Sequence, residues 1–444
     1  MRWTPLLAAC WSVLGAGCGA PAPLALQDLD DTDRRFVQPP RADAPQAIDD
    51  LLKKDSLTLE DVLLVADLMN PTLAVERKNI DLGAAEIWEA SLYPNPSLVL
   101  EVEDYATRGG SFGNSHRTAG VRLPVVISGR IGAATSLAEK KRDAAAVQYV
   151  WKRRQILTEV KRAFVSVLAA RRSVELMRET RDLAKTIHDV TDERFKAQAV
   201  PEMELLKAAV QLAKAESDLK LLEKDLRVSV KVLHSLMGSV DFPKDKFTGD
   251  LHTQFTTPSF EALRGQVTTV HPLLVAAAKA KEAAEFQLSL AEAERTPDLG
   301  VAVAGGKDAD GETILEGGIE IPLPFFNRNQ AKIAASETLI RQAELRMQAV
   351  RNDLILQLTT LYGEFAAAQE RVGVYKDEIL PKSQKALDQT AEGYRLGKFK
   401  HLDVLDAQRT LAEARIAFAA ALTDLNKSAT DLELITGTIL EPIR

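Results

Sequence analysis

The chain has 444 residues and a net charge of −7, from 56 basic and 63 acidic side chains. A protein that binds nucleic acid presents a basic face, so this balance gives no support to a nucleic-acid partner. The only two cysteines, Cys10 and Cys18, lie at the start of the chain, which excludes a disulfide scaffold. Glycine and proline are scarce, whereas strong helix formers such as Ala, Leu, Glu and Lys are abundant. This mixture favours long helices that pack through narrow seams.

The N-terminus has the three-part pattern of a secretory signal peptide. A positive charge at Arg2 precedes an apolar run, and small residues follow that run. Cys18, directly after these small residues, resembles the lipidated cysteine of a bacterial lipoprotein, although Gly15 stands where that motif prefers leucine. Lipidation at Cys10 and simple cleavage near Cys18 are the two alternatives. On each interpretation the mature chain leaves the cytoplasm.

The two halves of the chain repeat one sequence pattern. Asn70-Pro71 recurs as His271-Pro272 at an offset of 201 residues, Leu123-Pro124 as Ile321-Pro322 at 198, and Phe195-Lys196 as Tyr394-Arg395 at 199. So small a drift indicates that one unit of roughly 200 residues was duplicated. The chain then divides into a signal peptide (1–17), a proline-rich extended tether (18–56), the first repeat (57–238), a linker (239–258), the second repeat (259–437) and a C-terminal tail (438–444).

Each repeat reads, in chain order, as a helix, a pair of strands, a long helix, a turn and a second long helix. In the first repeat the strands are 98–103 and 118–124, where apolar and polar side chains alternate at a period of two. Their counterparts in the second repeat lie near 299–303 and 315–321. Four amphipathic strands are too few to close a membrane barrel, so strands must be pooled among chains, eight from two chains or twelve from three.

The helices carry a heptad pattern, which is typical of coiled-coil packing. Leucines step by seven from Leu205 to Leu233, and their repeat partners do so from Val404 to Leu432. The long helices before them are predicted at about 131–196 and 329–396, and a bend is expected at Pro381 in the second of these. The expected fold class is mainly α, with four strands per chain and an internal two-fold repeat.

Three segments resemble the TolC family of outer-membrane factors. They are the turn Tyr394-Arg395-Leu396-Gly397, the run from Leu402 to Gln408 that follows it, and Tyr93-Pro94-Asn95-Pro96 before the first strand. The stretch from Ile321 to Gln330 further resembles the metal-efflux branch typified by CzcC and CusC. The resemblance implies a homotrimer with a twelve-stranded β-barrel and a long α-barrel of coiled-coil helices in the periplasm.

The resemblance also implies a function, which is that of an outer-membrane exit duct in a tripartite efflux pump. Such a duct passively conducts substrate from a periplasmic adaptor (membrane fusion) protein and an inner-membrane transporter, here expected to be of the resistance-nodulation-division type. Heavy-metal cations are the candidate cargo. An outer-membrane duct for type I protein secretion is the alternative, and a periplasmic coiled-coil scaffold is a further one.

Two groups of residues are the candidate sites. The turns that hold Gln198, Gly397 and Lys398 lie between heptad-bearing helices, and they are expected to contact the adaptor. Asp403 and Asp406, spaced i, i+3, share one face of the final helix. They match aspartates that narrow the inner end of the duct in the family, which implies an acidic periplasmic gate. Alternatively, they are acidic residues favoured near a helix N-terminus.

The sequence gives no support to an enzyme, a metal site or a cofactor. The six histidines are scattered, without the spacing of a metal site. The sequence contains neither a phosphate-binding loop nor a nucleophile motif. The energy for transport is therefore expected to come from a partner.

Overall fold

The computed structural model describes residues 44–103, 115–396, 398–399 and 401–443. The predicted signal peptide with Cys10 and Cys18, and also Gly397, lie outside the described residues. The described chain divides into two compact units, to both of which each repeat contributes. Unit 1 contains Arg77–Gln148 and Pro272–Val350, and unit 2 contains the described residues up to Glu76, Tyr149–His271 and Arg351–Arg444.

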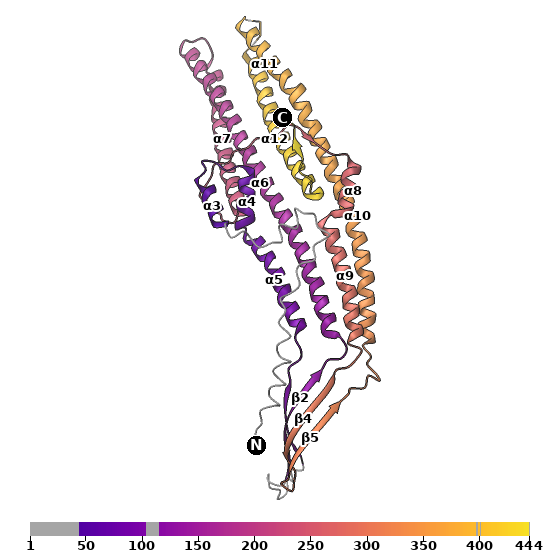
Figure 1. The fold of residues 1–444 in the computed structure, drawn as a ribbon. Helices are drawn as coiled ribbons and strands as arrows, with labels where there is room; N and C mark the ends of the chain where they lie inside the picture. The colour runs from indigo at the N-terminus through magenta and orange to yellow at the C-terminus, as the bar shows by residue number, and fades with distance from the viewer. Residues whose placement is uncertain (1–43, 104–114, 397, 400, 444) are drawn as a thin grey trace. The chain divides into compact units, whose positions relative to one another are not determined.

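Unit 1 holds a four-stranded antiparallel sheet (Figure 1). Its strands run in the order β1-β2-β4-β5, with the bounds β1 (Ser97–Glu103), β2 (His116–Val125), β4 (Leu299–Lys307) and β5 (Thr313–Glu320). The predicted two strand pairs are therefore confirmed. Leu98 lies opposite Val121, which in turn lies opposite Val303, so apolar side chains of neighbouring strands share one face. The other face carries Arg122 and Glu320, whose charged groups lie 3.3 Å apart.

Four helices contribute residues to unit 1. They are α5 (Pro71–Ser91), α6 (Arg130–Lys196), α9 (Pro272–Ala293) and α10 (Gln330–Val374). The 67 residues of α6 confirm the predicted long helix at about 131–196. Gly83 lets α5 approach α6 closely, because a Cβ there would lie only 2.9 Å from the Cβ of Arg142. In the described parts of the chain, no helix is both long enough and apolar enough to cross a membrane.

Unit 2 begins each repeat with a short capped helix. These are α4 (Leu59–Met69) and α8 (Phe260–Val270), and their N-caps Thr58 and Ser259 both accept a hydrogen bond from a backbone N–H of the first turn. The single helical pattern predicted around Asn70-Pro71 is two helices, because α4 ends before Asn70 and α5 begins at Pro71. The Asn70 Oδ1 accepts hydrogen bonds from the backbone N–H groups of Thr72 and Leu73 in the first turn of α5. The remaining helices of unit 2 are α3 (Ala44–Lys53), α7 (Glu202–Leu236), α11 (Leu380–Arg395) and α12 (His401–Thr436).

The prediction of an extended tether over 18–56 is wrong at its C-terminal end. Residues 44–53 form α3, and Leu51 packs into the core of unit 2. Pro45 does not prevent this helix, because it lies in the first turn, where its missing N–H costs nothing. The predicted linker 239–258 likewise contributes Phe242 and Phe247 to that core. The linker and the tail also meet, where β3 (Phe255–Thr256) pairs with β6 (Glu441–Pro442).

The second repeat departs from a continuous helix near Pro381, as predicted. A π-helical turn, η2 (Tyr375–Ile379), separates α10 from α11, and the Leu380 N–H donates to the Tyr375 carbonyl oxygen. This turn explains the last step of the drift in the repeat offset, from 198 to 199 residues. Buried Val174 corresponds to buried Val372 at 198 residues, whereas the offset is 199 beyond the turn. The second repeat therefore contains one extra residue, which the wider π-turn absorbs.

Candidate functional site

The two predicted gate residues line a groove between α11 and α12. The groove has a volume of about 480 Å³ and is lined by Ser383, Ala386, Thr390, Phe399, Asp403, Asp406, Ala407 and Thr410. Small side chains on both helices leave this space open. In the first repeat, Ile187 and Lys207 stand at the positions of Ala386 and Asp406. The first repeat therefore has a basic residue at the position of Asp406, and only the second repeat has acidic residues at both positions.

The heptad seam places Asp403 and Asp406 beside the helix packing. Val404 and Leu411 are buried, which confirms the predicted seam, whereas both aspartates are exposed. Arg409 lies 3.3 Å from the Asp406 carboxylate, and both side chains are about 70% exposed, so this ion pair is weak. Asp403 lies in the first turn of α12, where the helix dipole favours a carboxylate. The local geometry alone is therefore also compatible with the helix-terminus interpretation.

The two tip turns close their helices in a similar way. In the first repeat the Ala199 N–H donates to the Arg194 carbonyl oxygen and the Gln198 N–H to that of Phe195, with φ of +58° at Gln198. These are the two bonds of a Schellman motif, whose left-handed position favours glycine. In the second repeat the Lys398 N–H donates to the Gly393 carbonyl oxygen at 2.7 Å, again across five residues. The glycine expected at this left-handed position, Gly397, is the repeat partner of Gln198.

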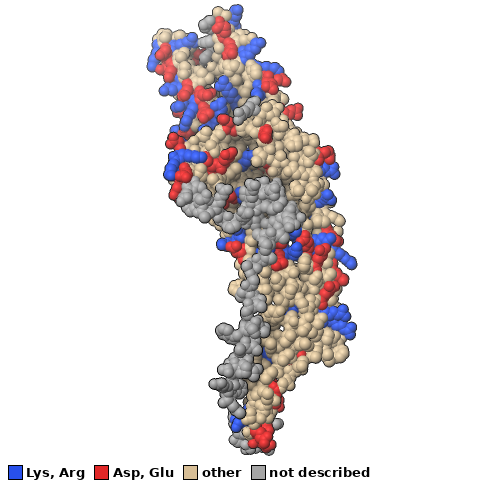
Figure 2. All heavy atoms as spheres, viewed as in Figure 1, with Lys and Arg blue, Asp and Glu red and all other residues tan. Residues whose placement is uncertain are grey.

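Phe399 is a tip residue that sequence reasoning missed. Its ring packs onto Gly393, where an added Cβ would lie 2.1 Å from the ring. The side chain is nevertheless about half exposed and lines the groove beside the aspartates. Heptad spacing gives no signal for it, because Phe399 lies in the turn between the helices. In the view of Figure 2, acidic and basic side chains are interspersed over the hairpin helices rather than gathered by sign.

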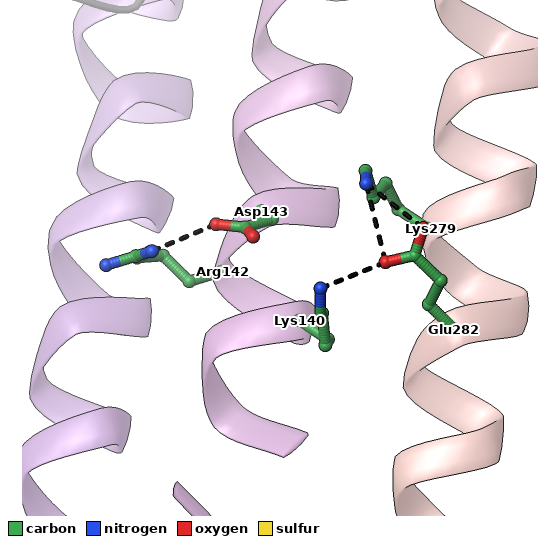
Figure 3. Close-up of polar contacts among 5 residues, drawn as sticks. All are labelled: Lys140, Arg142, Asp143, Lys279 and Glu282. Carbon is green, nitrogen blue, oxygen red and sulfur yellow. Dashed lines mark hydrogen bonds and ion pairs between the residues drawn. The ribbon is translucent and has the colours of Figure 1, made fainter. Parts of the chain in front are cut away.

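A cluster of charged side chains in unit 1 was not predicted (Figure 3). The Arg142 guanidinium lies 3.0 Å from the Asp143 carboxylate, and both side chains are buried. On α9 Lys279 lies 3.1 Å from Glu282, which also binds Lys140 of α6 at 3.1 Å. Burial acts to raise the pKa of Glu282, but hydrogen bonds from Lys279 and Lys140 outweigh it, so the pKa lies below its usual range. The Lys140–Glu282 pair joins α6 of the first repeat to α9 of the second.

In the described residues, no group of three or more His, Cys, Asp or Glu side chains is arranged to hold a metal ion. The charged cluster of unit 1 consists instead of ion pairs within α6, within α9 and between these two helices. Two repeats of long helical hairpins, each with a strand pair that exposes an apolar face, are the features of a membrane-associated channel. Comparison with known proteins then identifies the family.

The model of the family described as outer membrane efflux protein matches residues 65–239 and 263–438, once in each repeat. The chain belongs to this family, and it is an outer membrane efflux channel of the TolC type. It is 28% identical over 382 residues to the cobalt-zinc-cadmium resistance protein CzcC of Cupriavidus metallidurans, which covers 86% of this chain and 90% of the relative. The predicted resemblance to the family is therefore confirmed.

Two solved structures share the fold at low sequence identity. A crystal structure of CusC superposes with a TM-score of 0.71 at 15% identity, covering 85% of this chain and 91% of the other. The outer membrane protein VceC of Vibrio cholerae gives a TM-score of 0.66 at 17% identity, covering 85% and 96% of the two chains. The long helices and antiparallel strands described above are thus the fold of this family.

Proposed function

We propose that the chain forms a homotrimeric exit duct in the outer membrane, with its helices in the periplasm. The observation that carries this proposal is the apolar face of the sheet in unit 1, whose side chains are exposed in a single copy. Three copies would supply twelve strands, enough for a closed barrel whose apolar face meets lipid. Substrate would pass through the duct passively, because the channel family supplies no source of energy.

We propose divalent heavy-metal cations as the cargo. The support is the similarity to CzcC, whose name concerns resistance to cobalt, zinc and cadmium. Deletion of the gene should raise the cellular content of these metals, measured by mass spectrometry, and the intact gene should restore it. Unchanged metal content together with the loss of a secreted protein would contradict this proposal and support type I secretion.

We propose that the tip turns with Gln198, Gly397 and Lys398 contact a periplasmic adaptor, which links the duct to an inner-membrane transporter of the resistance-nodulation-division type. Gln198 and Lys398 are exposed between the paired helices, which supports this role. Photo-crosslinkers at Gln198 and Lys398 should capture the adaptor in cells. A crosslinker at Asp310, in the turn between β4 and β5, is the control and should not capture it. The opposite result would reverse the assignment.

We propose that Asp403 and Asp406 form an acidic gate that attracts cations. Three chains would bring six carboxylates to one constriction, whose field would favour divalent ions. Arg409 beside Asp406 offsets part of this charge. D403N/D406N should reduce cation selectivity and block by divalent ions in planar-bilayer recordings. Unchanged selectivity and block in a well-folded double variant would assign both residues to the N-terminus of α12 instead.

We propose that Cys18, which lies outside the described residues, is lipidated and adds an anchor in the outer membrane. C18S should abolish labelling with a radioactive fatty acid. The protein should still fractionate with the outer membrane, because the strands insert independently of the lipid. Labelling that persists in C18S would assign the lipid to Cys10.

A further inference from the structure

The polar face of the sheet in unit 1 is the face that carries Arg122 and Glu320. On this face a histidine meets a glutamate from a strand that is not its neighbour. His116 of β2 and Glu316 of β5 are separated by β4 in the sheet, yet the His116 Nε2 lies 3.0 Å from a carboxylate oxygen of Glu316. Neighbouring strands lie about 4.8 Å apart, so a contact that skips one strand requires that strand to leave room.

Strand β4 leaves this room because it presents only small residues to the polar face. Ala304 lies opposite Glu316, and Gly306 lies opposite Thr118. Gly120 of β2 lies opposite Ala304, and an added Cβ at Gly120 would lie only 2.5 Å from the Ala304 Cβ. This close approach of the two strands favours glycine there. The imidazole and the carboxylate therefore meet above a floor of small residues.

The polar face is also acidic. Glu103 of β1 lies directly opposite His116. The strand residues of this face include four carboxylates and one permanent cation, which are Glu101, Glu103, Glu316, Glu320 and Arg122. A surface dominated by one sign of charge concentrates ions of the other sign. Cations are thus drawn to the face on which the His116 ring lies.

We infer that His116 and Glu316 together bind divalent first-row transition-metal cations. Zn²⁺ binds imidazole nitrogen and carboxylate oxygen at about 2.0–2.2 Å, which sets two ligand atoms about 3.0 Å apart when they subtend a right angle at the ion. This is the separation observed here. A bound ion replaces the proton that the pair holds between nitrogen and oxygen. An imidazole ligand favours Zn²⁺ and Ni²⁺, whereas Mg²⁺ and Ca²⁺ prefer oxygen ligands alone.

Two protein ligands suit a site on a conduction path. Among the residues that the structure describes, no third His, Cys, Asp or Glu completes a metal-binding set around this pair. The remaining coordination positions are therefore left to water, and conduction requires that an ion be bound weakly enough to leave. The inference rests on the proposed function, in which the polar face lines the passage. It adds a step at which the duct distinguishes transition metals from Mg²⁺ and Ca²⁺.

Chemical protection of the histidines tests the site in the purified full chain in detergent. Diethyl pyrocarbonate acylates accessible neutral imidazoles, and peptide mass spectrometry gives the rate at each histidine. Zn²⁺ should slow the reaction of His116 about tenfold at a concentration of about ten times the dissociation constant, whereas Mg²⁺ should not slow it. His188 is the internal control, since it lies 3.2 Å from Asp189 and its side chain is exposed to a similar degree. Because it lies outside the polar face, its rate should change far less.

Two matched variants test the role of the carboxylate. E316Q removes a ligand and should raise the Zn²⁺ concentration that protects His116 by about tenfold or more. E320Q removes a negative charge from the same strand and the same face but leaves both ligands, so it should shift this concentration far less. The comparison of His116 with His188 uses the unchanged protein, so it decides the question even where a variant does not fold.

Three results would overturn the site. They are equal protection of His116 and His188 by Zn²⁺, equal protection of His116 by Mg²⁺ and Zn²⁺, and undiminished protection in a folded E316Q variant. The test is separate from that of the proposed cargo. Absence of protection together with a raised metal content after gene deletion would refute the site and leave the proposed function intact. Protection of His116 with unchanged metal content after deletion would support the site and contradict the proposed cargo.

Discussion

At the scale of single residues, the two repeats place different side chains at equivalent positions. Asn70 at the end of α4 donates from its amide to the Leu236 carbonyl oxygen, and His271 takes the same position in the second repeat. The His271 ring is buried, with the Trp151 ring centroid 4.8 Å away. Burial and then the nearby Arg154 charge lower the pKa of His271 to about 3.

This depressed pKa predicts a loss of stability in mild acid. The unfolded chain takes up a proton near the usual histidine pKa of about 6.5, whereas native His271 stays neutral down to about 3. Stability should therefore fall as the pH decreases below about 6.5, by about 2 kcal/mol between pH 7 and pH 5. H271N places at position 271 the asparagine that the first repeat has at position 70. The free energy of unfolding of this variant, measured by chemical denaturation at pH 7 and pH 5, should differ less between the two pH values than that of the unchanged protein. H188N changes a histidine whose side chain is only partly buried, and it should reduce the loss less than H271N does; an equal effect of both variants would contradict the prediction.

Gln198 offers a second prediction at this scale. A residue with a side chain is disfavoured at φ of +58°, and the repeat partner of Gln198 is a glycine. Q198G should therefore stabilise the tip turn by roughly 0.5–1 kcal/mol, seen as slower hydrogen exchange of the Ala199 amide. A199G, one residue further along, adds flexibility without relieving this strain and should not stabilise. Faster exchange in Q198G would show that the turn is not strained there.

At the scale of elements, long periodic segments could be predicted from sequence and irregular ones could not. The heptads located α6, α7 and α12, and alternation located all four strands, because each pattern reflects one buried face. The linker lacks such a period, so the burial of Phe242 and Phe247 gave no signal. The ionic cluster of Lys140 and Glu282 was missed because its partners lie on helices far apart in sequence.

The π-turn gives a prediction at this scale. Because η2 absorbs one extra residue, removal of Lys376 should convert the turn to α-helix and keep every later side chain on its original face. The variant should fold and retain its size on gel filtration in detergent. Removal of Glu364, in the regular part of α10, rotates all later residues by about 100° and should destroy the packing of Phe365. Equal tolerance of both deletions would contradict the assigned insertion.

At the scale of the whole molecule, the duplication bears on the proposed assembly of several copies. Inside the chain the two repeats meet through β2 and β4 and through the pairing of α6 with α12. The edge strands β1 and β5, and separately the helices α7 and α10, carry exposed apolar side chains. The pooling of strands among chains stays a prediction from the sequence, whereas the register between β2 and β4 came only from the structure.

The central claim is that several copies complete one channel, and the mass of the protein in detergent tests it most directly. Native mass spectrometry of the full chain should give three copies per particle, with the β-signal in circular dichroism retained. The mass should persist after salt is raised, because the seam between copies is mainly apolar. A monodisperse monomer that retains its β-structure would contradict the account.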